Sequence, residues 1–575
     1  MTVKKYILLI LSLVVFSFSF SQKQNTKITN RLTKEIKYSE KNIYTIWIFY
    51  KDKGNNIKSK LETAASVLPK HAIERRKKLM KNKNTVATFY DIPVNENYFR
   101  QTVKHITKLR HKSNWLNAIS AEADKNQINE IRSLPFVKKI DIVRTSHISK
   151  NNSEFNFASA YQKYSFRKSV NYNLNYGNSL NQLEQINVPA AHDLGYNGNG
   201  IIICVMDAGF NNLEHQVFAN MISENRILGT WDFVNNDTIV DDQNDMGNGD
   251  HGTMTLSTIG GFYEGQLIGP AYGAKFILTK TENTDSETTA EEDNWVAATE
   301  WAENNWGPDI TSTSLGYIDF DDGTGYDASE LDGNTATITI GADIAASLGI
   351  LVVNSAGNEG SGTTTIGAPA DGDSVLAVGA VDASGNRASF SSVGPTGDGR
   401  IKPEVMAQGL NVTVASPLSA DGYKTASGTS FSCPITAGAA AVLMQMVPTA
   451  SNMYIFKALK MTANNHENPN NDYGWGIINI INAYKYLNGT LETSSLKDKI
   501  TIFPNPVKNT LYINLADNTE NINLKIYNIN GQLMYENNYK NKKITVNTSD
   551  FLNGIFLLYL NTEKNSYIKK FIISR

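Results

Sequence analysis

Short, almost wholly apolar runs separated by helical patterns occupy the middle of this 575-residue chain. They are Ile201–Met206, Ile350–Val353 and Val375–Val381. A strand that is apolar at every position must be buried on both faces, which is typical of a parallel sheet covered by helices. In such sheets functional groups gather where the carboxyl ends of the strands meet the loops. The pattern predicts an α/β domain with its site at that edge.

Charge divides the chain into segments of opposite sign, although the whole chain carries a formal net charge of only −2. Residues 22–175 hold 31 Lys and Arg against 12 Asp and Glu, a balance of +19. Residues 176–490 hold 10 against 37, a balance of −27. Complementary fields favour docking of one segment on the other. The acidic neighbour argues against nucleic acid as the partner of the basic segment, and two solvated charged faces are the plainer alternative.

The first 21 residues show the order of charge and hydropathy that is typical of a secretory signal peptide. Lys4 and Lys5 precede an apolar run from Tyr6 to Phe20. This run is short for a transmembrane helix, which needs about 20 apolar residues. We therefore expect a signal peptide over residues 1–21 and no membrane anchor in the mature protein.

The chain contains two cysteines, Cys204 and Cys433. Two cysteines cannot build the disulfide framework of a small secreted domain. We expect both to be buried, unpaired and apolar in character, with a single disulfide between them as the alternative.

Composition and periodicity separate the rest of the chain into further segments. In the basic segment 22–150, strands and helices alternate at the spacing of a small α+β unit. The expected strands are Ile43–Tyr50, Trp115–Ser120 and Phe136–Val143, and the expected helices are Lys70–Lys81, Asn97–Arg110 and Asp124–Leu134. Residues 151–175 are polar and irregular, as in a linker. Residues 495–575 show period-two alternation and turn signals such as Asn530-Gly531, which predict a small β-sandwich.

The stretch from Gly428 to Pro434, with Ser430 at its centre, precedes a long apolar run that ends at Met446. Because Pro is tolerated in the first turn of a helix, the run predicts a buried helix that begins near Ser430. The Ser430 hydroxyl would then lie at the positive end of a helix. Such a serine is either a helix cap or, with a base and an acid nearby, a nucleophile.

Three other polar residues stand beside strand or helix patterns. Asp207 ends the first apolar run, His251 precedes Gly-Thr, and Asn358 follows Ala-Gly after the second apolar run. Each one alone has an ordinary explanation as a turn Asp, a solvated His or a loop Asn. Together with Ser430 they occur in the order Asp, His, Asn, Ser.

This order and its flanking residues resemble the subtilisin-like serine proteases, or subtilases, over about residues 176–490. The resemblance implies an α/β fold with a subtilisin-like parallel sheet flanked by helices, and a secreted serine endopeptidase. It implies Ser430 as nucleophile and His251 as its base. Asp207 would orient the imidazole, and the Asn358 amide would donate to the oxyanion together with the Ser430 backbone N–H.

The same resemblance implies where substrate binds. Ser314, Leu315 and Gly316 match the edge on which a substrate peptide adds as an extra strand. Ala356 and Gly357 are small, which leaves room for a sizeable side chain before the scissile bond. One departure is Ile435, which stands where many members carry His, at a position with no assigned chemistry.

No cofactor is implied for the chemistry, but many subtilases bind structural calcium. Two stretches are rich in carboxylates, one with Asp241, Asp242 and Asp245 and one with Asp319, Asp321 and Asp322. Loop carboxylates can bind Ca²⁺, but neither stretch has an EF-hand pattern, and solvated acid is the alternative. We assign no metal ligands from the sequence.

The segment before the linker resembles the inhibitor propeptides of subtilases. The resemblance rests on Trp115–Ala118 and Leu134–Val137. It implies a zymogen in which residues 22–150 are an intramolecular inhibitor and residues 151–175 are processed.

The C-terminal segment resembles the sorting domain of type IX secretion cargo. The resemblance rests on Phe503–Val507, Ile526–Gly531, Gly554–Phe556 and Lys569–Ile573. It implies passage through the periplasm, a type IX secretion machinery as partner, and a secreted or cell-surface protein. A generic adhesive β-sandwich is the alternative.

Two other functions fit parts of the pattern. The fold could serve as a catalytically inactive surface-binding protein, although all four chemical positions are present. An acid-acting relative of the sedolisin type uses Glu and Asp instead of His, and His251 before Gly-Thr argues against it. The expected partners are therefore protein or peptide substrates, the chain's own propeptide and the secretion machinery.

Overall fold

The structure is a computed structural model that divides into two compact units, residues 1–487 and residues 488–575. It describes residues 27–39, 41–79, 86–143, 145–147, 172–242, 249–282, 289–316, 326–489, 500–515, 521–528, 532–562 and 566–575. The segment expected to be a signal peptide and most of the expected linker lie outside these residues. Each unit is described by itself.

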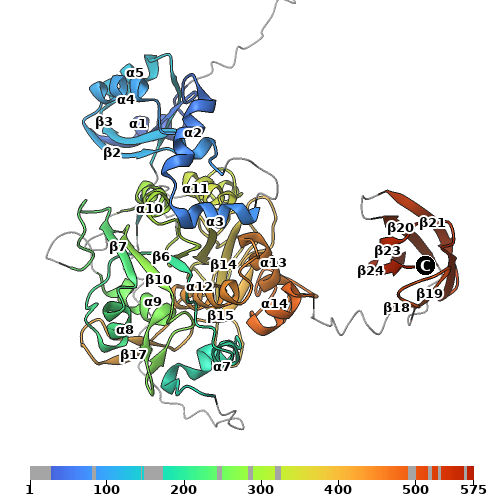
Figure 1. The fold of residues 1–575 in the computed structure, drawn as a ribbon. Coiled ribbons are helices and arrows are strands. Elements are labelled where there is room, and N and C mark those ends of the chain that lie inside the picture. Colours follow the sequence, from blue (N-terminus) through green and yellow to red (C-terminus); the bar gives the residue numbers. More distant parts are fainter. Residues whose placement is uncertain are drawn as a thin grey trace, which may run out of the picture. The chain divides into compact units, whose positions relative to one another are not determined.

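A parallel sheet of seven strands forms the centre of the first unit, in the order β15-β14-β13-β12-β6-β10-β7 (Figure 1). The strands are β6 (Ile202–Asp207), β7 (Ile227–Asp232), β10 (Lys275–Lys280), β12 (Ile310–Thr313), β13 (Leu351–Ser355), β14 (Val375–Val381) and β15 (Val405–Gln408). All residues of β6, β12, β13, β14 and β15 are buried. The predicted parallel sheet is confirmed.

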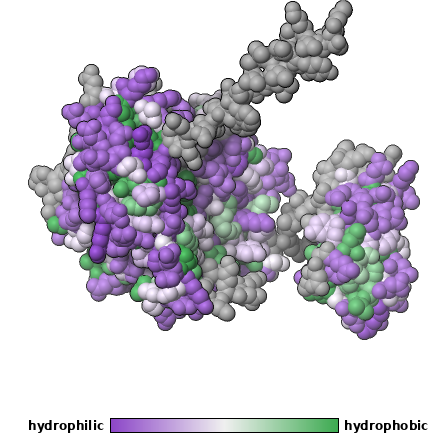
Figure 2. Space-filling model, turned by 90° about the horizontal axis from the view of Figure 1, so that it is seen from above, coloured by the Kyte–Doolittle hydropathy of each residue, from purple (hydrophilic) through white to green (hydrophobic). Residues whose placement is uncertain are grey.

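Helices cover both faces of this sheet, because successive side chains of a strand point to opposite faces. Ile203 and Val205 pack with α9 and α12, whereas Ile202, Cys204 and Met206 pack with α10 and α11. The helices are α6 (Leu180–Glu184), α7 (Val188–Asp193), α8 (Ala219–Ser223), α9 (Asp250–Gly260), α10 (Glu292–Asn305), α11 (Thr337–Ser347), α12 (Thr429–Met446), α13 (Asn452–Met461) and α14 (Ile480–Leu487). Hydrophobic residues are scattered over a mostly hydrophilic surface in Figure 2, as expected when the apolar runs lie inside.

Short hairpins and one short strand complete this domain. They are β8 (Phe262–Tyr263) with β9 (Leu267–Ile268), β16 (Val412–Ala415) with β17 (Tyr423–Ala426), and β11 (Thr289–Glu291) just before α10.

The N-terminal part of the first unit, residues 27–147, has its own sheet, in the order β2-β3-β1-β4. Its elements are α1 (Asn30–Tyr38), β1 (Tyr44–Tyr50), α2 (Ile57–Val67), α3 (Lys70–Leu79), α4 (Glu96–Thr102), β2 (Lys108–Ser113), β3 (Ala118–Ala123), α5 (Lys125–Ser133), β4 (Val137–Ile142) and β5 (Thr145–His147). Ile46, Ile48, Ile119, Ile128 and Ile131 belong to one core between this sheet and its helices. The predicted α+β unit is confirmed, and we call it the N-terminal domain.

Two predicted elements of the N-terminal domain are wrong in extent. The helix expected over Asn97–Arg110 ends at Thr102, and Lys108–Ser113 instead pairs with β3 as an edge strand. The strand expected from Trp115 begins at Ala118. Trp115 lies before this strand, and its ring is buried in the core beside α10 and α11.

The second unit contains two antiparallel sheets, β18-β19-β22 and β21-β20-β23-β24. The strands are β18 (Ile500–Phe503), β19 (Thr510–Leu515), β20 (Ile522–Asn528), β21 (Leu533–Tyr539), β22 (Lys543–Asn547), β23 (Gly554–Thr562) and β24 (Ser566–Ile573). Leu511 and Ile513 of one sheet share a core with Leu524, Ile526 and Leu558 of the other. The predicted β-sandwich is confirmed. No helix among the described residues is long and apolar enough to cross a membrane.

Candidate active site

The carboxyl end of β6 carries Asp207, and the first turn of α9 places His251 against it. His251 Nδ1 lies 2.6 Å from Asp207 Oδ1. The Thr255 hydroxyl donates to Oδ2 at 2.9 Å, and the Ala208 N–H donates to Oδ1 at 2.8 Å. The Asp207 side chain is buried, whereas the His251 side chain is 27% exposed. A buried carboxylate therefore holds one imidazole nitrogen and leaves Nε2 as the nitrogen for proton transfer.

Glycine after His251 is required by packing. A Cβ atom at Gly252 would lie 2.0 Å from the carbonyl oxygen of Gly209. Helix α9 can approach the loop after β6 only without a side chain there. The His-Gly pair of the sequence thus brings His251 within hydrogen-bonding distance of Asp207.

Ser430 is the second residue of α12, which begins at Thr429. The sequence predicted that Pro434 lies in the first turn of this helix, but it lies in the second turn. Proline has no N–H to donate to the carbonyl four residues earlier, and that carbonyl belongs to Ser430. The Ser314 hydroxyl donates to it instead, at 2.8 Å. The Ser430 hydroxyl donates to the Ser314 carbonyl at 3.4 Å.

The first turn of α12 also adjoins the imidazole. The rings of Phe431 and His251 have centroids 5.9 Å apart. The serine and the histidine predicted from the sequence are thus brought to one edge of the sheet.

Asn358 is held by the residue that precedes Ser430. Its Oδ1 accepts from the Thr429 backbone N–H at 2.9 Å and from the Thr429 hydroxyl at 3.0 Å. These two bonds orient the amide, so that Nδ2 is the group that remains for a ligand. The Thr429 hydroxyl also accepts from the Gly357 N–H at 3.2 Å. Thr429 was not predicted from the sequence.

Two hydrogen-bond donors and the serine surround one position beside Gly428. An atom at the Cβ position of Gly428 would lie 3.6 Å from Asn358 Nδ2, 3.6 Å from the Ser430 nitrogen and 3.7 Å from Ser430 Cβ. Gly428 has a φ of 156°, in the region that favours glycine. A side chain at Gly428 would be strained and would enter this space. The Asn358 amide nitrogen and the Ser430 nitrogen thus border one space beside the serine.

The predicted substrate-binding residues lie after two neighbouring strands. Ser314, Leu315 and Gly316 follow β12, and Ala356 and Gly357 follow β13. β12 itself ends at Thr313, before these residues, because its ladders with β6 and β13 stop there.

The segment before β14 adjoins Gly316 and is fixed by a buried lysine. The carbonyl oxygen of Ala368 would lie 3.9 Å from a Cβ at Gly316. Lys402 Nζ donates to the carbonyl oxygens of Gly372 at 2.8 Å and Val375 at 3.0 Å. It also donates to Glu404 Oε2 at 2.8 Å, and the lysine is fully buried. The ammonium thus binds three oxygens and links the segment before β14 to Glu404.

The N-terminal domain docks on α10 and the loop after it through buried charges. Arg75 and Arg76 of α3 both donate to Glu303 Oε1, at 2.6 and 2.7 Å. Arg110 donates to Asp293 at 2.8 Å. Burial works to raise the pKa of Asp293, but the charges of Arg110 and His111 outweigh it and lower that pKa.

Glu300 of α10 accepts three hydrogen bonds from one loop of the N-terminal domain. The donors are the Ser113 hydroxyl and the backbone N–H groups of Asn114, at 2.8 Å, and Trp115, at 3.3 Å. Burial nevertheless raises the pKa of Glu300 to about 7, because desolvation outweighs these bonds. At the end of the same domain, β5 pairs with β11 in an antiparallel ladder, His147 opposite Thr289.

The acidic stretches and the two cysteines singled out in the sequence lie partly among the described residues. No group of three or more His, Cys, Asp or Glu side chains gathers there to hold a metal ion. Asp245, Asp319, Asp321 and Asp322 lie outside the described residues. Cys204 and Cys433 are unpaired and buried, as expected, and burial raises the pKa of each thiol to about 12.

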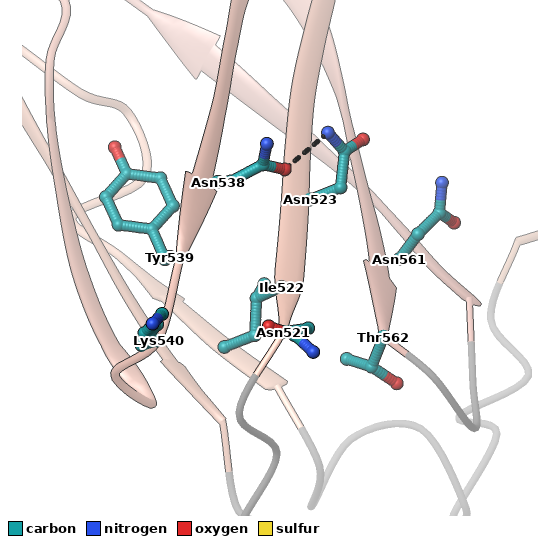
Figure 3. Close-up of a pocket in the computed structure, with 8 residues that line it drawn as sticks. All are labelled: Asn521, Ile522, Asn523, Asn538, Tyr539, Lys540, Asn561 and Thr562. Atoms are coloured by element: carbon teal, nitrogen blue, oxygen red, sulfur yellow. Dashed lines mark hydrogen bonds between the residues drawn. The ribbon is translucent and has the colours of Figure 1, made fainter.

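The second unit has a polar depression of its own, at one end of its larger sheet (Figure 3). It is lined by Asn521, Ile522, Asn523, Asn538, Tyr539, Lys540, Asn561 and Thr562. Asn523 Nδ2 donates to Asn538 Oδ1 at 2.8 Å. Amide side chains predominate in this lining, which contains no His, Cys, Asp or Glu. The depression is therefore a weaker candidate for an active site than the region around Ser430.

Comparison with known proteins agrees with this geometry. Residues 198–476 match the Subtilase family. Subtilisin NAT from Bacillus subtilis subsp. natto is 30% identical over 378 residues, which are 65% of this chain and 82% of that protein. The chain belongs to the subtilase family. Subtilisin from Bacillus pumilus is 32% identical over 303 residues, or 52% of this chain and 96% of that protein. Serine protease AprX from Bacillus subtilis strain 168 is 32% identical over 313 residues, or 50% and 66%.

The flanking segments match two further families. Residues 45–158 match the Peptidase S8 propeptide domain of Bacteroidota, and residues 501–574 match the Secretion system C-terminal sorting domain. This subtilase is thus a serine-type endopeptidase with a propeptide and a type IX sorting domain, which directs it to secretion or the cell surface. The N-terminal domain is hereafter called the propeptide domain.

Proposed function

We propose that this subtilase cleaves peptide bonds through an acyl-enzyme on Ser430. Ser430 Oγ attacks the scissile carbonyl carbon, and His251 Nε2 takes the hydroxyl proton. The same imidazolium then gives this proton to the leaving amine as the C–N bond breaks. Water attacks the ester with His251 again as base, which releases the second product and restores the serine.

Asp207 is a positioning residue in this scheme. Its carboxylate accepts from Nδ1 and keeps the proton-transfer nitrogen at Nε2, and it stabilises the imidazolium that forms. Thr255 and the Ala208 N–H also bind this carboxylate, which fixes it in place.

The observation that carries the proposal is the position beside Gly428, where Asn358 Nδ2 and the Ser430 N–H converge. Donors that are already in place stabilise the oxyanion without reorganisation, which is commonly the largest single contribution to such catalysis. The Ser314–Gly316 backbone would bind the substrate as an added strand, and the small residues Ala356 and Gly357 would leave room for a sizeable side chain before the scissile bond.

We further propose that the chain is a zymogen with the domain limits expected from its sequence. Residues 1–21 would be the signal peptide, 22–150 the propeptide, 151–175 the processing region, 176–490 the peptidase domain and 495–575 the sorting domain. The ladder between β5 and β11 supports inhibition, because the end of the propeptide lies on an edge strand of the peptidase domain.

Site-directed substitution tests this assignment. Ser430→Ala and His251→Ala should each lower kcat by about 10⁴-fold or more while the processed protein stays folded. Activity of the wild-type enzyme should rise through about pH 6–8, where a histidine base loses its proton. An acid optimum, or full activity of Ser430→Ala, would contradict the proposal.

A further inference from the structure

Four carboxylates of the peptidase domain are bound mainly by groups of the propeptide domain. Asp293, Glu300, Glu303 and Asp309 lie on α10 or in the loop that follows it, and together they are called the α10 acidic surface. None is more than 5% exposed. Arg110 donates to Asp293, and Arg75 and Arg76 donate to Glu303. The Ser113 hydroxyl and the N–H groups of Asn114 and Trp115 donate to Glu300. His71 lies within hydrogen-bonding distance of Asp309. Asp309 also accepts from an N–H of its own domain, that of Ile202, at 3.0 Å.

The fit is closest where α3 meets Glu303. The neighbouring residues Arg75 and Arg76 converge on Oε1, and Arg75 also donates to the Pro308 carbonyl at 2.5 Å. Glu303 Oε2 is buried and has no hydrogen-bond partner among the described residues. A third donor could therefore bind there.

Glycines let the helix lie close to this surface. A Cβ at Gly307 would lie 2.6 Å from the Cβ of Ala72, and one at Gly349 would lie 3.2 Å from Leu79 Cδ1. Both Ala72 and Leu79 belong to α3. The surface is thus shaped for a helix that presents two neighbouring arginines.

Removal of the propeptide, which is part of the proposed function, takes these partners away. The four carboxylates then remain on a segment, residues 176–490, whose charge balance is −27. We propose that the α10 acidic surface becomes an exosite in the processed enzyme, and that it recruits protein substrates with a pair of neighbouring arginines on a helix. Arginine is favoured over lysine because its fork can bind carboxylate and carbonyl oxygens together.

The exosite is continuous with the edge on which the propeptide pairs. α10 begins at Glu292, directly after β11, and β11 pairs with Thr145–His147. The propeptide is the first chain that this enzyme binds, and it reaches β11 with its arginines on the N-terminal side. Substrates that use the exosite should likewise carry the arginine pair N-terminal to the bond that is cut.

The test uses the processed wild-type enzyme and two protein substrates. Each is a small helical carrier followed by the same unstructured cleavable tail. One carrier helix presents an Arg-Arg pair, and the other presents Gln-Gln at the same positions. At low ionic strength kcat/KM should be about tenfold higher for the arginine substrate. The ratio should approach one in about 0.5 M salt, because exposed charges are then screened.

An enzyme variant locates the effect. Glu303→Gln should abolish the preference for the arginine substrate, whereas Glu467→Gln, which removes an exposed carboxylate after α13, should keep it. If wild-type enzyme cleaves the two carrier substrates with equal kcat/KM at low salt, or if the preference survives Glu303→Gln, the exosite is overturned.

A short fluorogenic peptide is cleaved in parallel. Loss of that cleavage in wild-type enzyme would contradict the proposed function itself, whereas retained cleavage without an arginine effect would overturn the exosite alone.

Discussion

At the scale of single residues, the site depends on groups that orient other groups. Thr429 holds the Asn358 amide, Asp207 holds His251, and Ser314 replaces the helix bond that Pro434 cannot make. Each orienting bond fixes a side chain before substrate arrives. In such a site kcat falls strongly when a hydrogen-bond donor to the transition state is removed.

Asn358→Ala should therefore lower kcat by about 10²–10³-fold with little change in KM, because the lost donor acts on the oxyanion and hardly on bound substrate. Steady-state kinetics on a peptide substrate measure this. Asn386→Ala, which removes an exposed turn amide, is the matched control and should change kcat less than twofold. A purely raised KM in Asn358→Ala would point to substrate binding instead.

Glu300 makes propeptide docking depend on pH. Burial raises its pKa from 4.5 to about 7 in the docked state, so the docked state holds the proton more tightly than the separated state. This stabilisation is complete below about pH 4.5 and is lost as the pH rises to about 7. The Kd of the isolated propeptide for processed enzyme should rise roughly tenfold or more across this window. Titration by inhibition assays should show a flatter profile for Glu300→Gln, and an equally steep one would argue against Glu300.

The sequence singled out Asp207, His251, Asn358 and Ser430 as candidates, but it did not single out Thr255 and Thr429, which support them. Those four have distinctive neighbours such as His-Gly-Thr and Gly-Thr-Ser. Thr255 and Thr429 are ordinary hydroxyl residues, and only their distances in the folded chain reveal what they bind.

At the scale of elements, strands were predictable where burial alone decides their state. β14 spans the predicted Val375–Val381, because every residue of it is buried. β2 was not predictable, because Lys108–Ser113 is an edge strand with charged residues, and only its ladder with β3 makes it a strand. α12 shows an intermediate case, since its apolar run predicted the helix but not the turn in which Pro434 lies.

The segment before β14 depends on the ammonium of Lys402. Lys402→Met should leave Glu404 buried without this partner and lower the free energy of unfolding by about 3–5 kcal/mol, as when a buried pair is broken. Urea denaturation of the processed enzyme measures this loss. Adding Glu404→Gln to the same variant should restore part of it, and a single variant as stable as wild type would contradict the role of Lys402.

The ladder between β5 and β11 should contribute a separable part of propeptide binding. A propeptide that ends at Val143 keeps the contacts with α10 but lacks the residues that pair with β11. We expect it to inhibit processed enzyme about tenfold or more weakly than one that ends at Lys150, because several backbone hydrogen bonds are lost at about 1 kcal/mol each. Inhibition constants against a short peptide give the comparison. Equal potency of the two would show that pairing of β5 with β11 contributes nothing to inhibition.

At the scale of the whole molecule, opposite charge joins the propeptide domain to the peptidase domain. The balances of +19 and −27 predicted docking, and the structure places arginines of one domain on buried carboxylates of the other. The sequence could not predict which residues meet, because these arginines and carboxylates are separated by 183 to 228 positions.

The central claim is that Ser430 is an activated nucleophile in the processed enzyme and masked in the zymogen. A fluorophosphonate probe, followed by mass spectrometry of the labelled peptide, tests it most directly. We predict a covalent adduct on Ser430 in processed wild-type protein, much slower labelling in His251→Ala, and little labelling while the propeptide is docked. Absence of an adduct on Ser430 in folded, processed wild-type protein would contradict the account.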